Sequence, residues 1–458
     1  MHHTPDQQTC DLHAAQPFFE TILRAALPPS LLQPASVVHR GRPLEVSHEQ
    51  LWLSLLLAVL LGMNSYQDLW RTMRQPLLDG CEPIQVTDDA LIKRFKRAGL
   101  QPLEETLSRL GACLAPHLAS VQQRTTELAP FASRIVALDE TTWDAVQRHL
   151  APLRCLPDGD ARLLPGKLAG RFDVRRQQWD FVQWRVDPQA NCKVDVCSLL
   201  HELPPFSLLL FDLGYFSFPW LDYLTQLNYS FVCRLREKTT YRLAHVFYQH
   251  EGILDALVWL GSPKGAHCGH LVRLVRFHDG TDLRCYLTNV LDPRQLSLPD
   301  VARLYARRWD IELAILTIKD LLHLQHWWSS QPVLIQQQAF AVLIVAQLVQ
   351  AVRLLAAAQA GCDPFEVSLP LLVQFVPQFI FQRLHPLRWM GTYGHVLGLI
   401  RPASRRVLQL PCLDLAQYVF APAELALTRK ACYLEYVPTP GRSSRAKKKS
   451  AQVPNNSS

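Results

Sequence analysis

The spacing of apolar residues changes twice along this 458-residue chain. Beyond about residue 130 the helical spacing gives way to short strand-like runs, and beyond about 330 it returns, with long apolar segments at 332–360 and 367–384. Residues 1 to about 125 show helical spacing throughout, which predicts helices at 16–26, 47–62, 64–74, 88–98 and 102–120.

Short apolar runs between 130 and 236 predict the strands of a central core. SRIVALDETTW and PFSLLLFDLGYF are apolar runs that reach an acid, and LAGRFDVRRQQWDFVQWRV predicts a hairpin around a polar turn. A helix from Pro219 to Leu227 and the buried strand YSFVCRLR follow. Alternating runs between 237 and 290 predict a mainly β insertion. Periodicity alone therefore predicts a mixed α/β protein.

Two apolar stretches are candidates for a membrane-spanning helix. Leu51–Met63 is shorter than the roughly 18 residues that a span needs. Ala339–Ala358 is longer, but Gln347, Gln350 and Arg353 interrupt it at helical spacing. Both stretches are predicted to be buried helices. The N-terminus has no basic segment followed by an apolar run, so we expect no signal peptide, no membrane partner and a cytoplasmic, nucleoid-associated protein.

Composition agrees with a globular protein that binds polyanions. Apolar residues make up 48% of the chain, charged residues 19%, and the net charge is +7. That charge supports a nucleic-acid partner without establishing one. The twelve cysteines include no C-x-x-C pair, and Cys192 with Cys197 is the nearest approach. The spacing lacks the paired ligands of a zinc site and is typical of reduced thiols in the cytosol.

One basic helix is a candidate for DNA contact. In VTDDALIKRFKRAGL, Thr87 or Asp88 caps a helix that follows another predicted helix at Ser65–Met73. The two could form a helix-turn-helix-like pair whose second helix meets DNA. The alternative is a solvated basic helix over an apolar core. The basic residues around Phe95 are Lys93, Arg94, Lys96 and Arg97, and Lys93, Arg94 and Arg97 are the predicted contacts.

The stretch YARRWDIELAILTIK carries the most specific polar pattern. Tyr305, Arg308, Glu312 and Lys319 stand at offsets 0, 3, 7 and 14, which fall on one face of an α-helix. This face would line a cleft with an acid, two cations and a phenol. The alternatives are a solvated face and an ordinary pair of Arg308 with Glu312. A stripe spaced for burial runs beside it, made of Leu304, Ile311, Ile315, Ile318 and Leu322.

Two further acids follow apolar runs at predicted strand ends, where ligands meet a sheet. Asp139 ends VALD and Asp212 ends LLLFD, and with Glu312 they would supply carboxylates from three separate segments. Phosphodiester chemistry with divalent cations needs such a set. Glu140, Asp144, Asp173 and Asp310 compete with these three, but each is predicted to be a surface or turn acid, with Asp310 directed away from Glu312.

The spacing Tyr-x2-Arg-x3-Glu-x6-Lys resembles the YREK signature of DDE transposases in insertion-sequence family 4. YLTNV before it and RRWDIE within it are similar to that family, as are D-x-T at Asp139 and D-x-G-Y at Asp212. The resemblance covers about residues 130 to 335. It implies an α/β fold with an RNase H-like catalytic core and a β-rich insertion, flanked by helical N- and C-terminal regions.

The domains expected from the pattern and the resemblance together follow this order. They are a helical DNA-binding region (1–125), the first part of the core (126–236), the β-rich insertion (237–290), the second part of the core with the signature helix (291–360), a C-terminal helical region (361–436) and a disordered basic tail (437–458).

The resemblance also implies an activity. It is cut-and-paste transposition, in which the enzyme cleaves and joins strands at the ends of an insertion sequence with two Mg²⁺ ions, or Mn²⁺ as a substitute. Asp139, Asp212 and Glu312 would be the catalytic metal ligands. Double-stranded DNA at element ends and target would be the partner, and a homodimer would form the synaptic complex. The alternatives are an RNase H-like nuclease without strand transfer and a catalytically inactive, transposase-derived DNA-binding protein.

Further DNA contacts follow from the same resemblance. Arg308 would grip a phosphate bidentately, Lys319 would act as a point charge, and Tyr305 would hydrogen-bond a phosphate near the cleaved end. If a hairpin forms, a flipped base would stack on an aromatic residue of the insertion, where Trp259 is the tryptophan present. A buried core position is the alternative for Trp259. Trp309, Trp327 and Trp328 are predicted to be structural.

Overall fold

The computed structural model describes most of the chain and divides it into two compact units. Unit 1 comprises residues 1–130, 139–188 and 307–408, and unit 2 comprises 131–138, 189–306 and 409–458. Each unit is discontinuous in sequence, so the units cut across the predicted domains, whose boundaries stay a prediction. The residues described are 17–32, 46–75, 78–122, 128–143, 146, 151–157, 160–262, 264–324, 326–402 and 410–429, and the predicted basic tail lies outside them.

The N-terminal part of unit 1 is helical, as the apolar spacing predicts. Ser47 caps α3 by accepting a hydrogen bond from the backbone N–H of Gln50, and Thr87 caps α5 in the same way through Ala90. The helices here are α1 (Phe18–Ala26), α2 (Pro29–Leu32), α3 (His48–Leu60), α4 (Tyr66–Met73), α5 (Asp88–Ala98) and α6 (Gln101–Gln122).

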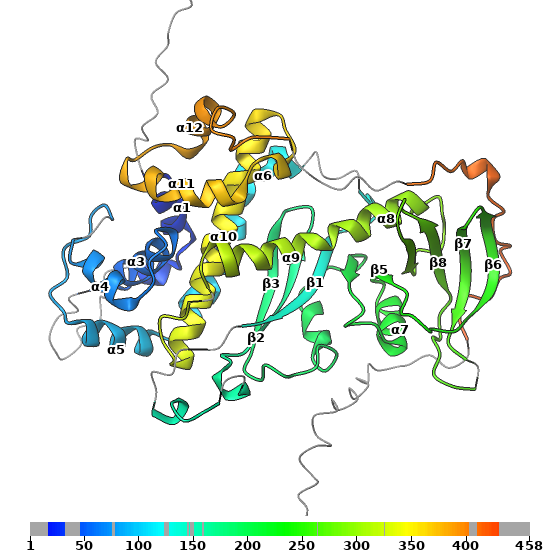
Figure 1. Cartoon of the computed structure of the whole chain (residues 1–458), viewed down its shortest axis with the longest axis horizontal. Coiled ribbons are helices and arrows are strands. Elements are labelled where there is room, and N and C mark those ends of the chain that lie inside the picture. The colour runs from blue at the N-terminus through cyan, green and yellow to red at the C-terminus, as the bar shows by residue number, and fades with distance from the viewer. Residues whose placement is uncertain are drawn as a thin grey trace, which may run out of the picture. The chain divides into compact units, whose positions relative to one another are not determined.

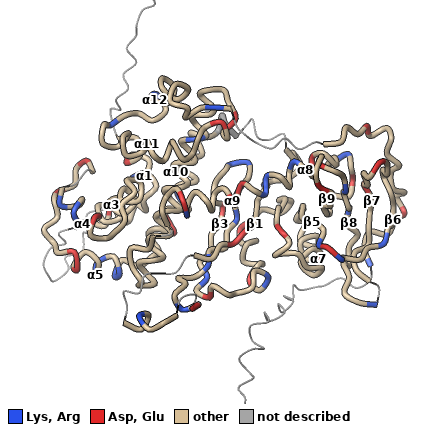
Figure 2. Tube along the Cα trace, in the orientation of Figure 1, with Lys and Arg blue, Asp and Glu red and all other residues tan. Residues whose placement is uncertain are grey.

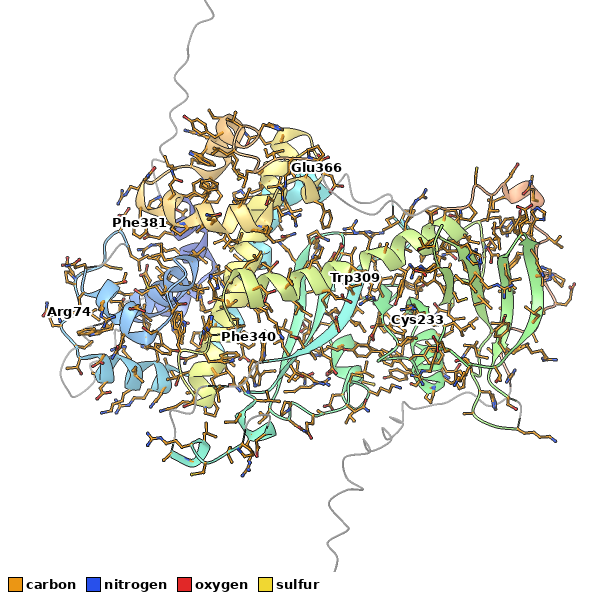
Figure 3. All side chains as sticks on the ribbon, in the orientation of Figure 1. Arg74, Cys233, Trp309, Phe340, Glu366 and Phe381 are labelled. Carbon is orange, nitrogen blue, oxygen red and sulfur yellow. The ribbon has the colours of Figure 1, made fainter. Side chains whose placement is uncertain are left out.

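Helix α10 (Pro332–Ala360) is the core of unit 1 and packs against α3, α6, α11 (Leu369–Phe381) and α12 (Pro386–Tyr393). It is apolar on every side, and Phe340 marks its course in Figure 3. By length and composition it could cross a membrane, but 94% of its most apolar window is buried within the protein. The prediction of a buried helix is therefore confirmed. It ends at Gly361, whose positive φ of 68° suits a helix C-terminus.

A β-hairpin completes unit 1. Strands β2 (Lys167–Asp173) and β3 (Gln178–Arg185) pair antiparallel, as predicted, and lie beside the second half of β1 (Ile135–Thr142). Asp173 fixes the turn, because its Oδ1 accepts the backbone N–H groups of Arg175 and Arg176 at 2.9 and 2.8 Å. Asp173 is thus a turn acid, in agreement with the sequence, although only 3% of it is exposed.

Unit 2 is built on a mixed sheet (Figure 1). The first half of β1 pairs parallel with β4 (Leu208–Phe211), β4 pairs parallel with β5 (Ser230–Arg234), and β5 pairs antiparallel with β9 (Leu283–Thr288). Helix α7 (Phe218–Gln226) joins β4 to β5. All four residues of β4 are fully buried, which explains their uninterrupted apolar run.

The predicted β-rich stretch contributes four strands to the same sheet. They are β6 (Tyr241–His250), β7 (Ile253–Leu260), β8 (Val272–His278) and β9, and neighbouring strands in this series pair antiparallel. Because β9 pairs directly with β5, the stretch extends the sheet rather than forming a separate one. Residues 410–429 contain one 3-10 turn (Leu415–Gln417) and no α-helix, although a helical region was expected there.

A fully buried ion pair ties the parts of unit 2 together. The guanidinium of Arg273 on β8 binds both carboxylate oxygens of Asp255 on β7 at 2.6 Å and also donates to the carbonyl of Leu296. The Tyr418 hydroxyl donates to the same carboxylate at 3.2 Å. Neither charged side chain is exposed to solvent. One charge pair therefore joins two strands, the approach to α8 (Leu298–Arg307) and the C-terminal segment.

We expect Asp255→Asn to lower the free energy of unfolding by about 3–5 kcal/mol, because it leaves the charge of Arg273 buried without its counter-charge. Denaturant unfolding of the purified chain measures this. The matched control is Asp282→Asn, whose side chain is 62% exposed beside Arg284, and it should change the stability by no more than about 0.5 kcal/mol. Equal stability losses in the two variants would contradict the role of the pair.

Candidate functional site

Asp139 lies on β1 directly after the last residue of its parallel pairing. Leu138 is in register with Phe211 of β4, and Asp139 is the next residue along β1. Its side chain is partly exposed, and its Oδ1 accepts the backbone N–H of Glu140 at 2.8 Å. Glu140 is occupied by Lys167 at 2.7 Å and Arg185 at 3.5 Å. Both acids of the strand are partly exposed, and Glu140 is held in ion pairs.

Asp212 directly follows Phe211 and begins a tight turn. Its Oδ1 accepts the backbone N–H of Gly214 at 2.7 Å. A Cβ on Gly214 would lie only 2.9 Å from that oxygen, so a larger residue here would press against the Asp212 carboxylate. Glycine at this place in D-x-G-Y avoids that contact. Asp212 therefore stands at a strand end with one oxygen oriented by the backbone.

Three side chains hold the carbonyl groups of the turn that follows Asp212. Arg236 donates to the carbonyls of Leu213 and Phe216 at 3.2 and 2.9 Å. Lys193 donates to that of Phe216 at 2.8 Å, and the Cys192 thiol to that of Gly214 at 3.2 Å. Sequence inspection missed these three residues, because the contacts depend on the turn and not on any motif.

The signature stretch is not the single α-helix that its spacing predicts. Helix α8 ends at Arg307, α9 runs from Trp309 to Leu316, and residues Thr317–Leu321 form a π-helix. A π-helix has wider turns, so Lys319 does not keep the α-helical phase that was expected from its offset. Leu304, Ile311, Ile318 and Leu322 are buried as predicted, whereas Ile315 is partly exposed.

Glu312 and Arg308 form an ion pair on α9 at 2.5 Å. Arg308 is 7% exposed, while the Glu312 side chain is 28% exposed. The pairing that the sequence offered as an alternative for Arg308 is therefore present. Trp309 beside it is 58% exposed, so the prediction of a structural tryptophan is wrong here (Figure 3). Trp327 is buried, and Trp328 packs edge-on against Tyr66 at 5.5 Å, so both are structural.

Lys319 joins the signature stretch to β1 by a hydrogen bond. Its Nζ donates to the carbonyl of Thr142 at 2.8 Å and lies 5.3 Å from the ring centre of Trp143. Thr142 is three residues beyond Asp139 on the same strand. Within unit 1, this contact connects the segment that carries Glu312 to the strand that carries Asp139.

Asp310 corrects another expectation, since it is buried and not a surface acid. Only 2% of it is exposed, and its Oδ2 accepts hydrogen bonds from Gln177 and Arg307, each at 2.7 Å. Gln177 and Arg307 also both donate to the carbonyl of Val174. Asp310 therefore binds the start of α9 to the turn between β2 and β3, and it orients the helix that carries Glu312.

Tyr305 and Trp259 are both buried within unit 2. Tyr305 is 7% exposed and packs on Tyr286 of β9 with ring centres 4.8 Å apart. Trp259 is also 7% exposed, belongs to an apolar cluster with Phe247, and has the Arg429 guanidinium 4.6 Å from its ring centre. The alternative of a core tryptophan fits Trp259, because this ring offers no open face to a base.

Figure 2 shows basic residues along α5. They differ in burial, because Lys93 and Arg97 are largely exposed, whereas Arg94 is half-buried and desolvation lowers the pKa of its guanidinium. The connection between α4 and α5 spans residues 74–87. A helix-turn-helix has a turn of three or four residues, so the expected helix-turn-helix-like pair is not formed.

The predicted site residues divide between the units. Asp139, Arg308, Glu312 and Lys319 belong to unit 1, while Asp212, Tyr305 and Trp259 belong to unit 2. Among the described residues, no group of three or more His, Cys, Asp and Glu side chains is gathered closely enough to hold a metal ion. The donors themselves are suitable, because carboxylate oxygens are the ligands that Mg²⁺ prefers. Asp144 lies outside the described residues.

Part of the chain is similar to a transposase domain. Residues 194–348 match the family model described as the transposase DDE domain. No curated protein matches the chain. Among solved structures that match, one is a piggyBac transposase synaptic complex with hairpin DNA, determined by cryo-EM, with a TM-score of 0.39, 10% sequence identity and 87% of each chain covered. The support for a DDE transposase rests on the family match, which includes Asp212 and Glu312 but not Asp139.

We expect Asp310→Ala to loosen the turn between β2 and β3, because Gln177 and Arg307 lose a buried acceptor, at a cost of about 1–3 kcal/mol. Amide hydrogen exchange of residues 174–178 should then quicken roughly tenfold or more. The control is Asp320→Ala, which removes an exposed acid from the π-helix. Unchanged exchange in Asp310→Ala would show that the carboxylate does not hold the turn.

Proposed function

We propose that this protein is a DNA transposase of insertion-sequence family 4 with an RNase H-like core. Its activity is metal-dependent strand cleavage and strand transfer at element ends, with Asp139, Asp212 and Glu312 as the metal ligands. The family match supports the transposase class. The three proposed ligands come from separate elements: Asp139 lies on β1, Asp212 directly follows β4 and Glu312 lies on α9.

The observation that carries the proposal is the register between β1 and β4. Leu138 pairs with Phe211 on parallel neighbouring strands, and the next residue on each strand is an aspartate. The carboxyl ends of parallel strands meet at one edge of a sheet. Asp139 follows Leu138 and Asp212 follows Phe211, and these two residues are in register. This register favours a position for both aspartates at the same edge of the sheet. Two carboxylates at such an edge are what a site for divalent cations requires.

Glu312 is the third ligand in this proposal, and two contacts support its assignment. Lys319 binds the carbonyl of Thr142 on β1, and Asp310 binds the hairpin that lies beside β1. Both contacts hold the segment around Glu312 against the strand of Asp139. Arg308 forms an ion pair with the Glu312 carboxylate and is the group that would exchange that partner for a phosphate.

Mg²⁺, when bound, supplies charge neutralisation at the phosphate and an activated oxygen nucleophile. The protein itself holds and orients the carboxylates that would bind the ions. Asp212 keeps one oxygen on the N–H of Gly214. Asp139 keeps one on the N–H of Glu140. These backbone contacts fix each carboxylate before any ion or substrate arrives, which reduces the reorganisation that catalysis would otherwise need.

The partner in this proposal is double-stranded DNA at the element ends and at the target, with a homodimer in the synaptic complex. Exposed Lys93 and Arg97 on α5 support a contact with the phosphate backbone. Arg94 is the weaker candidate because half of it is buried. Tyr305 would need to become accessible before it could meet a phosphate. The protein would act in the cytoplasm, on the DNA of the nucleoid.

A metal-dependent nuclease that only hydrolyses DNA would use the same carboxylates. The two activities differ in the fate of the freed 3′-hydroxyl, which a transposase joins to a second DNA. A strand-joining assay with DNA that flanks this reading frame separates them. Joined products support transposition, and cleaved but unjoined products support the nuclease. An inactive DNA-binding protein would give neither product.

We expect Asp212→Asn, Asp139→Asn and Glu312→Gln each to lower Mg²⁺-dependent DNA cleavage by about a thousandfold or more, because each removes a charged ligand. Product formation on gels measures this, and chelation of the metal with EDTA should abolish cleavage by the unmodified protein. The matched control, Asp282→Asn, removes an exposed acid and should cleave normally. Cleavage that persists unchanged in Asp212→Asn would show that the triad is misassigned.

A further inference from the structure

Two cations converge on one carbonyl oxygen beside the turn of Asp212. Lys193 Nζ lies 2.8 Å and an Arg236 guanidinium nitrogen 2.9 Å from the carbonyl oxygen of Phe216. The two charged nitrogens are therefore no more than about 6 Å apart. Lys193 comes from the segment before β4 and Arg236 from the end of β5, so the fold brings them together across 43 residues of sequence.

Their surroundings favour an anion. The carbonyl oxygen of Phe216 brings two cationic side chains close together, and two neighbouring cations are a common setting for an anion. Burial, and next the charge of Arg236, lower the pKa of the Lys193 ammonium group, which shows the strain between the two cations. Phe216 also directly precedes Ser217, the N-cap of α7, where the helix adds positive potential. The Arg236 side chain remains largely exposed, so a ligand can reach it.

We propose that Lys193 and Arg236 form a site for one phosphate group of the DNA backbone, next to Asp212. Arg236 supplies planar N–H donors and Lys193 a point charge, the two modes by which proteins hold phosphodiesters. The phosphate would be held beside Phe216, four residues along the chain from Asp212. The inference rests on the proposed function for its source of phosphate, since it takes DNA to be the substrate.

The competing explanation is that both side chains only clamp the turn. The two explanations differ in what the charge does. A clamp needs a hydrogen-bond donor, and a phosphate site needs the charge as well. Lys193→Gln and Arg236→Gln keep a donor and remove the charge, while Lys193→Arg keeps both. Arg242→Gln, which removes an exposed charge from β6 in the same unit, is the matched control.

The test is the salt dependence of binding to a DNA duplex, with EDTA present so that no cleavage takes place. Loss of one phosphate contact lowers the slope of log affinity against log salt by about 0.9. We expect this lower slope in Lys193→Gln and in Arg236→Gln. In Lys193→Arg and in Arg242→Gln the slope should equal that of the unmodified protein. Unchanged slopes in both charge-removing variants, or no binding of duplex by the unmodified protein, would overturn the site.

A local measurement does not depend on how well the variants fold. Acylation of lysines in the unmodified protein, read by mass spectrometry with and without duplex, reports whether DNA covers each one. We expect the duplex to slow acylation of Lys193 severalfold and to leave the exposed Lys264 unchanged. Equal acylation of Lys193 with and without DNA would show that no phosphate binds there.

The outcomes separate this site from the proposed function. If the carboxylate variants cleave DNA normally while Lys193→Gln has a lower slope of log affinity against log salt, the assignment of the triad is wrong and the phosphate site stands. If the carboxylate variants abolish cleavage while the slopes of Lys193→Gln and Arg236→Gln are unchanged, the proposed function stands and the phosphate site is wrong.

Discussion

The parallel pairing of β1 with β4 is the constraint on which the candidate chemistry depends. Both strands are fully buried along their paired residues, so their register is fixed by packing on two faces. A slip of one residue would pair a different residue of β1 with Phe211 and turn the side chains of β1 to the opposite faces of the sheet. Because Leu138 is in register with Phe211, Asp139 and Asp212 each follow a residue of the same register pair, although β4 ends at Phe211 and β1 continues to Thr142.

The acids of this protein fall into two groups according to their surroundings. Asp222, Asp255 and Asp310 are almost fully buried, and each carboxylate is bound by several donors. Such carboxylates stabilise the fold, because the loss of one leaves its donors unsatisfied. The three proposed metal ligands are all partly exposed. The three buried acids therefore differ in burial from the three proposed ligands.

The interruption of the signature stretch changes how its residues act. An uninterrupted α-helix would present Tyr305, Arg308, Glu312 and Lys319 as one row. Instead, the π-helical turn directs Lys319 to the end of β1, and Tyr305 packs on Tyr286. Lys319 is thus also a structural contact, which binds the helix to the strand of Asp139. Arg308 and Glu312 remain the ionic pair of α9.

The sequence by itself determined most of the secondary structure elements and placed Asp212 directly after β4. Asp139, which was expected at a strand end, lies three residues before the end of β1. Apolar periodicity depends on local backbone geometry, and this is why helices α1 and α3 to α6 lie within a few residues of their predicted bounds, whereas the signature stretch is divided into three helical segments. Only the tertiary structure decided the environment of each polar side chain. Asp310 is buried because Gln177, 133 positions away, donates to it, and Lys319 binds Thr142 across 177 positions. Contacts over such separations leave no periodic signal, so Lys193 and Arg236 became visible only when the fold placed them on one carbonyl oxygen.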